Sequence, residues 1–219
     1  VHPFGNDNKL EIGVKRINRL TTNTYNTEIS NFNAISWLPL DSLNNIFKYN
    51  QEVSAAYLSS NFNLLNDFSM LLGLRYEHTN ISGSYSRYYN SFDNDYGNLV
   101  PSFTLSKKIN MFQTIKLSYV NRIQRPDVHK INTNVDVSDL NNISKGNPYL
   151  EPSNSHQIEL GYTSFKPGLM TTFFLYYKEK RNLVEQYDVL LFDDVFETNY
   201  LNAGTNKSVG FNFFGSSTI

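Results

Sequence analysis

The side chains that could carry out chemistry are numerous in this chain, but their types and spacing do not assemble a catalytic centre. Cysteine is absent, which excludes thiolate metal sites, disulfides and thiol catalysis together. The four histidines are not spaced as metal ligands: His2, His78, His129 and His156. The sequence also lacks a nucleophile elbow, a glycine-rich phosphate loop and a His-Glu-x-x-His pattern. It therefore predicts no catalytic residue, no metal site and no cofactor.

One acidic stretch needs separate treatment, because Asp93-Asn94-Asp95-Tyr96-Gly97 resembles the start of a calcium-binding loop. Such a loop needs a bidentate glutamate at its twelfth position, and that place is taken by Thr104. The stretch therefore predicts polar connecting structure and no calcium ion.

Aromatic side chains in the polar stretches offer a different chemistry, which is stacking on a ligand. The candidates for ligand contact are Trp37, Tyr85, Tyr88 and Tyr89. These rings could stack on carbohydrate in a soluble, sugar-active β-protein, which is the enzyme-class alternative. They could instead pack the polar stretches together or contact a ligand from them, which is the interpretation we favour.

Composition and charge narrow the classes of protein. The chain has 219 residues with aromatic content of 15%, too many rings for a disordered segment. The net charge of −1 provides no basic field to attract nucleic acid. No apolar run is long enough for a transmembrane helix, and residues 1–5 do not resemble a signal peptide. A strand pattern begins almost at once, so we expect the chain to be a piece of a longer protein.

Alternation of apolar and polar residues is the main structural signal. In residues 68–80 the large apolar side chains occupy even positions from Phe68 to Tyr76, with Arg75 and Glu77 among the odd ones. This period of two indicates a strand with one apolar and one polar face. Eight such strands are predicted, at about 9–22, 52–62, 68–80, 99–107, 114–124, 154–163, 170–184 and 196–215.

The two strand faces are given different roles by the residues that they carry. On the apolar side of strand 52–62 we place Val53, Ala55 and Tyr57. The polar faces carry charges of both signs, among them Glu11, Lys15 and Glu52. The polar side chains predicted to face the lumen of a barrel are Arg75, Glu77, Lys116, Arg122 and Glu159.

The connections between these strands alternate in length. Residues 22–50, 82–98 and 126–153 are long and polar, 188–194 is intermediate, and 63–67, 108–112 and 165–168 are tight. In an antiparallel meander every long connection then leaves from one rim. This asymmetry is typical of an all-β, up-and-down transmembrane β-barrel with long external loops and short periplasmic turns. A soluble β-sandwich also alternates, but its strands usually have five or six residues, and several here exceed ten.

Short motifs resemble a known family. A Tyr-x-x-Arg-x-x-Arg-Pro strand end in 118–126 precedes Gly-Asn-Pro-x-Leu-x-Pro at 146–152 and a descending strand at 157–162. Upstream, 52–57 holds an Ala-Tyr pair and 73–79 reads Gly-Leu-Arg-x-Glu-x-Thr. The order and content of these motifs resemble the barrel of TonB-dependent outer-membrane receptors, over most of residues 10–215.

The resemblance implies a location and a function. The chain would be part of a single barrel domain in the bacterial outer membrane, contacting lipid and supplying about a third of a wall of about twenty-two strands. Its partners would be the TonB system, through a plug domain outside this sequence, a surface lipoprotein, and a small-molecule, glycan or peptide ligand. Residues that shape the loop would be Arg125, Pro126, Gly146, Asn147 and Pro148. A barrel with a structural or assembly role remains the alternative to import.

Overall fold

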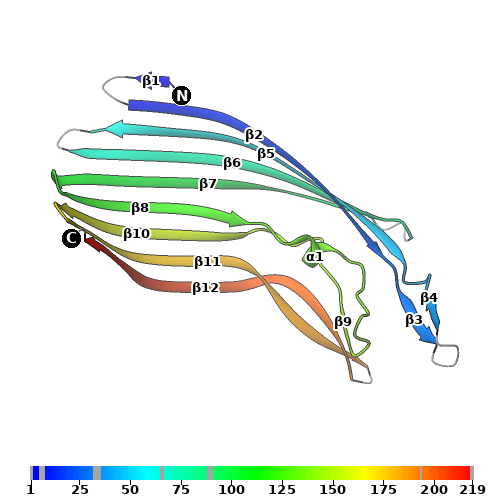
Figure 1. Ribbon diagram of the computed structural model, residues 1–219. Coiled ribbons are helices and arrows are strands. Elements are labelled where there is room, and N and C mark those ends of the chain that lie inside the picture. Colours follow the sequence, from blue (N-terminus) through cyan, green and yellow to red (C-terminus); the bar gives the residue numbers. More distant parts are fainter. Residues whose placement is uncertain are drawn as a thin grey trace.

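The computed structural model describes residues 2–4, 8–31, 36–64, 67–87, 91–192 and 194–217. Most of them form one curved, open sheet, antiparallel except at its short last strand, with a short helix lying against it (Figure 1). Its strands, in spatial order, are β1 (His2–Phe4), β2 (Asn8–Tyr25), β5 (Asn45–Asn63), β6 (Phe68–Tyr85), β7 (Ser91–Asn110), β8 (Gln113–Gln124), β10 (Ser153–Lys166), β11 (Leu169–Phe192), β12 (Val195–Ser217) and β9 (Asn142–Ser144). Eight of these are long, which confirms the predicted meander.

The short connections share one rim of the sheet. The turn between β10 and β11 consists of Pro167 and Gly168, and Gly168 has a φ of 74°, the left-handed value that a type II turn requires at its third residue. In the turn from β7 to β8, the side chain of Asn110 accepts from the Phe112 N–H at 2.9 Å. The Pro-Gly turn predicted from the sequence is therefore confirmed.

The other rim carries the longer excursions. Between β2 and β5 lies a small hairpin of β3 (Glu28–Asn31) and β4 (Ser36–Pro39). Residues 125–152, the 125–152 loop, join β8 to β10 and contain α1 (Val128–Ile131) and β9. Figure 1 shows α1 and β9 toward the same end of the sheet as the β3–β4 hairpin.

Strand register defines two faces. The inner face is the one against which the 125–152 loop packs, and it carries Arg75 and Glu77. The outer face carries large apolar side chains that stay solvent-accessible, for example Leu72 at 39% and Leu117 at 39%. Further members of this outer set are Ile12, Val14, Leu58, Leu74, Leu99, Ile115, Ile158, Leu160, Phe173, Leu175, Phe211 and Phe213.

The apolar part of the outer face forms a band limited to the half of the sheet near the short turns. In β11 it runs from Leu169 to Tyr177, after which Glu179 and Arg181 occupy the same face as an ion pair at 2.9 Å. At the same level the Tyr119 hydroxyl and His156 Nδ1 are hydrogen bonded at 2.9 Å and their rings stack. The band is therefore about nine residues tall and edged by amphipathic rings, dimensions that suit a tilted membrane-crossing strand. In the described part of the chain, no helix is long and apolar enough to span a bilayer.

The predicted loop at residues 82–98 is wrong for most of its length. β6 continues to Tyr85 and β7 begins at Ser91, with Ser82 paired to Asp93. Likewise β2 extends to Tyr25 and β11 to Phe192. Beyond the apolar band the outer face carries polar side chains such as Ser82, Asp93 and Asp95, so the apolar outer stripe ends although the backbone pairing continues.

Two face assignments also need correction. Ala55 pairs with Glu77, so the set Val53, Ala55 and Tyr57 lies on the inner face and not on the apolar outer one. Glu52 belongs to the outer face, where it forms an ion pair with Arg16 at 3.1 Å. Small and aromatic residues on β5 alternate as regularly as aliphatic ones, and periodicity alone does not show which face they belong to.

Candidate functional site

The 125–152 loop packs on an apolar cluster at the long-loop end of the inner face. The fully buried Phe47 and Ile131 form its centre, joined by Tyr49, Ile81 and Phe92. Phe47 also stacks on Tyr85 with ring centroids 4.9 Å apart. The sheet residues come from β5, β6 and β7, while Ile131 comes from α1. This part of the inner face is thus the packed core of the described chain.

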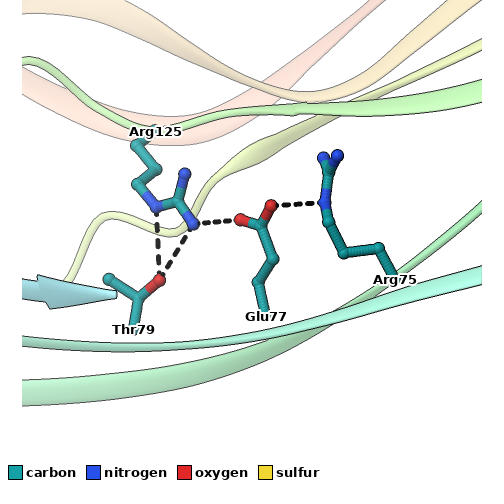
Figure 2. A network of polar contacts seen from close by, with 4 residues as sticks. All are labelled: Arg75, Glu77, Thr79 and Arg125. Atoms are coloured by element: carbon teal, nitrogen blue, oxygen red, sulfur yellow. Dashed lines mark hydrogen bonds and ion pairs between the residues drawn. The ribbon is translucent and has the colours of Figure 1, made fainter. Parts of the chain in front are cut away.

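A buried ionic network fixes the start of the loop. Arg125 extends from the end of β8 across the inner face, where it forms an ion pair with Glu77 and donates two hydrogen bonds to Thr79 Oγ1, at 3.2 and 3.1 Å (Figure 2). Arg75 approaches the other oxygen of Glu77 at 2.6 Å. The Glu77 side chain is only 10% exposed, so its charge is stabilised by these partners and not by water.

The Gly-Asn-Pro turn fixes the end of the loop. A Cβ on Gly146 would lie 2.3 Å from the backbone oxygen of Asn132, so only glycine fits here. The Gly146 N–H donates to that oxygen at 2.9 Å, and the Asn147 N–H donates to Lys130 O at 2.7 Å. The Asn147 side chain also donates to Tyr200 O at 3.0 Å. The motif therefore joins α1 to β12, while Pro148 O accepts from Asn94 at 3.4 Å.

Two asparagines that sequence reasoning missed complete this attachment. Asn182 has a φ of 58° at a register shift in β11, and its side chain donates to Pro152 O at 3.3 Å. The side chain of Asn202 on β12 accepts from the Glu151 N–H at 2.8 Å and donates to Glu151 O at 2.9 Å. The signal that could have identified Asn182 is its tolerance of left-handed backbone at a bulge, but thirty asparagines in the chain obscure it.

Burial sets the protonation of the tyrosines under the loop. Burial raises the pKa of Tyr49 to about 12, against a smaller lowering by Arg19. Burial likewise raises the pKa of Tyr85 and that of Tyr96. These phenols are therefore neutral hydrogen-bonding groups at physiological pH.

The predicted ligand-contact aromatics lie in different surroundings. Trp37 on β4 is 68% exposed and free to meet a ligand. Tyr85 is half-buried, and its hydroxyl donates to Asn132 Oδ1 at 3.0 Å and accepts from the Thr133 N–H at 2.8 Å. Tyr88 and Tyr89 lie outside the described residues. The structure thus assigns Tyr85 to loop packing, with its ring also lining a hollow of about 480 Å³ beside Leu43.

The five predicted lumen-facing residues share one face by register. Arg75 and Glu77 are neighbours on β6, and Ser118 between Lys116 and Arg122 on β8 pairs with Glu159 on β10. The structure brings Arg75 and Glu77 into contact with each other, whereas Lys116, Arg122 and Glu159 have no ion pair among the described residues.

Two adjacent hollows lie on the inner face, and the 125–152 loop lines the first of them. One of about 470 Å³ is lined by Arg19, Tyr49, Arg125 and Lys130, and one of about 720 Å³ by Lys15, Tyr57, Arg75 and Arg122. Their size is in the range of small-molecule sites. In the described part of the chain no three His, Cys, Asp or Glu side chains cluster as a metal site, and Asp93 and Asn94 point to opposite faces of β7. The arrangement offers cations, phenols and amides for noncovalent binding.

Three solved receptors superpose on most of the chain. The ferric-catecholate import receptor Fiu from Escherichia coli K12 does so with TM-score 0.64, 12% identity, and coverage of 97% of this chain and 33% of Fiu. The ferric yersiniabactin uptake receptor FyuA from Yersinia pestis superposes with TM-score 0.63 and 15% identity, and the match covers 97% of this chain and 30% of FyuA. A double mutant of the Serratia marcescens hemophore receptor HasR, solved with HasA and heme, superposes with TM-score 0.63 and 12% identity. That match covers 93% of this chain and 39% of HasR. No curated protein matches in sequence.

The class that follows is a membrane-spanning β-barrel wall with a loop-covered rim, a fold shared with these three uptake receptors. The chain belongs to the outer membrane protein beta-barrel family, whose model matches residues 1–219. It therefore resides in the bacterial outer membrane, and the predicted fold class and family resemblance are confirmed. The chain spans about a third of the length of each similar receptor.

Proposed function

We propose that this chain forms part of the wall and external vestibule of an outer-membrane receptor that imports a scarce nutrient. The observation that carries the proposal is the 125–152 loop, which is folded onto the inner face by Arg125 and by the Gly146–Asn147 turn. A purely structural wall has no need of a loop held inside it. The similar receptors, named for heme, ferric-catecholate and ferric yersiniabactin, support an import function.

The proposal places residues 1–219 within a single barrel domain, with the remaining strands and a plug supplied by other parts of the protein. Coupling to the TonB system would run through that plug, and a surface lipoprotein could cover the long-loop rim. Trp37 is the exposed aromatic offered to the ligand at that rim.

Loop excision in the full-length gene product tests the proposal. Because Gly146 N–H and Asn132 O are only 2.9 Å apart, residues 133–145 can be replaced by a short Gly-Ser link without displacing α1. Cells carrying the wild-type gene would be supplied with labelled iron as heme, ferric catecholate or ferric yersiniabactin.

We expect uptake of one of these by the wild type, and its loss in the excised variant, with equal amounts of both barrels in the outer membrane. If uptake is unchanged by the excision, the loop does not lie on the ligand path. A wild-type protein that inserts but supports no uptake of any chelate, even with TonB present, would favour the structural barrel.

A further inference from the structure

Charged side chains are distributed unequally between the two faces of the sheet. The strand residues whose register gives them the inner face include nine cations: Lys9, Lys15, Arg19, Arg75, Lys108, Lys116, Arg122, Lys178 and Lys180. The carboxylates on that face are Glu11, Glu77 and Glu159 in the regular part of the strands, and Glu185 beyond the register shift of β11. The outer face is nearly balanced, with Arg16, Lys48, Lys107, Lys166, Arg181 and Lys207 against Glu52, Asp93, Asp95 and Glu179. A chain with a net charge of −1 therefore has a strongly positive inner face.

The cations concentrate around the two hollows. Both hollows share Ile17, Val53 and Arg125 as walls, so they adjoin each other, and we term the two together the cation trough. Its basic side chains are Lys15, Arg19, Arg75, Arg122, Arg125 and Lys130.

The cation trough has two carboxylates, Glu77 and Asp127, against its six basic side chains, so its net charge remains positive. Glu77 is shared by Arg75 and Arg125, and Asp127 Oδ1 accepts from the His129 N–H at 2.9 Å as the N-cap of α1. Among the described residues, Lys15, Arg19 and Arg122 have no carboxylate within 4.0 Å.

Burial of the surrounding walls strengthens the field of these cations. Val53, which lines both hollows, is buried, and residues 125–128 and Lys130 of the 125–152 loop cover one side of the first hollow. A hollow lined by one sign of charge raises the local concentration of the opposite ion. Guanidinium groups such as Arg19 and Arg122 match carboxylate, phenolate and phosphate oxygens with paired hydrogen bonds.

We propose that the cation trough binds a small molecule that carries several oxyanions. The inference deepens the proposed function, on which it rests, because it names the chemical class of the imported ligand. The Tyr49 and Tyr57 rings on the trough wall add hydrogen-bonding hydroxyls for a ligand that is also hydroxylated or aromatic.

The test uses the full-length protein in detergent and two iron chelates of similar size, anionic ferric citrate and an uncharged ferric trihydroxamate. Arg19→Gln and Arg122→Gln each remove one trough cation from an exposed strand position, so folding is preserved. Lys116→Gln is the matched control, because it removes the same charge from the same exposed face but does not line the trough.

We expect ferric citrate to bind, with an affinity that falls as salt is raised, and each arginine variant to weaken it about tenfold, as for loss of a charged hydrogen bond. Lys116→Gln should change it less than about twofold. The inference is overturned if ferric citrate does not bind, if the trihydroxamate binds equally well, or if Lys116→Gln is as damaging as Arg19→Gln.

Uptake by cells separates this inference from the proposed function. Binding of ferric citrate that needs Arg19 and Arg122, without uptake of any chelate, would support the cation trough and refute import. Uptake that is insensitive to both arginine substitutions would support import and refute the cation trough.

Discussion

The two halves of the long strands are built on different principles although their backbone pairing is continuous. In β6, residues 68–76 alternate except at Leu71, with Leu72 and Leu74 exposed on the outer face. From Glu77 to Tyr85 the outer face of the same strand is polar. Its inner side chains, such as Thr79 and Ile81, are buried under the 125–152 loop. The half near the short turns is stabilised by lipid around it, and the other half by a core of its own.

This difference explains why a single sheet can serve both as a membrane wall and as a binding scaffold. Hydrophobic burial in the outer band needs no partner chain, because the bilayer supplies the apolar surroundings. In the other half, Phe47 and Ile131 bury each other across the inner face and hold a loop there. Substitutions in the two halves should therefore destabilise the protein for different reasons, through lost packing in one half and through charge placed in lipid in the other.

The largest effect is expected in the loop-covered half, at Phe47. This ring is fully buried, so Phe47→Ala removes its packing and leaves a cavity under α1, which should cost about 3 to 5 kcal/mol. Urea titration of the full-length protein refolded into lipid vesicles measures this. Leu20→Ala, at a 76% exposed outer position on β2, is the control and should cost less than about 0.5 kcal/mol. Equal costs would contradict the existence of the separate core.

In the membrane half, the outer face should reject charge. Leu72→Arg and Leu117→Arg place a guanidinium in the lipid near mid-band and should each cost about 2 to 4 kcal/mol. Ser118→Arg, on the inner face beside Glu159, should be mild. The same vesicle titration serves as the measurement, and similar tolerance at all three positions would refute the assignment of the faces.

The ionic network should contribute less, since Arg75 is 45% exposed and partly solvated. Glu77→Ala should cost about 2 kcal/mol, because it leaves Arg125 half-buried without its carboxylate. A double-mutant cycle with Arg125→Ala gives the coupling: if the two residues interact, the second substitution should cost less in the Glu77→Ala background. If the costs of the two substitutions simply add, Arg125 and Glu77 do not stabilise each other.

The smallest effect is expected at the far attachment of the loop. Asn202→Ala removes two hydrogen bonds to the Glu151 backbone and one to Asn182 O, and should cost about 1 kcal/mol. The 125–152 loop should then be cleaved faster by added protease while the barrel stays inserted. Asn206→Ala, lower on the same strand, is the matched control. Unchanged cleavage would show that Asn202 does not hold the loop.

Sequence reasoning succeeded in the membrane half because lipid imposes a strict rule on alternate residues. Leu72, Leu74 and Leu117 reveal their face through periodicity alone, and the Pro167-Gly168 turn through its residue types. The number and order of the long strands follow from the same pattern.

The other half could not be predicted in the same way, because its burial depends on contacts between residues far apart in sequence. Phe47 and Ile131 are separated by more than eighty positions, and nothing local shows that a loop covers the strand. Residues 82–98 look like a loop for this reason, since their outer face holds serine and aspartate. Arg125 was predicted as a structural residue, but its partner Glu77 lies on a strand that only the register brings near.

Depth-dependent fluorescence quenching tests the central claim most directly. The chain contributes no cysteine, so single cysteines can be placed along β6 and labelled with an environment-sensitive dye after reconstitution into vesicles. Leu72→Cys and Leu74→Cys report the outer face, and Gly73→Cys and Arg75→Cys the inner face. We expect lipid-chain bromines to quench the dye at positions 72 and 74 and not at positions 73 and 75. A water-soluble quencher should do the reverse. Equal quenching of all four positions by brominated lipid would contradict a two-faced wall with lipid on one side.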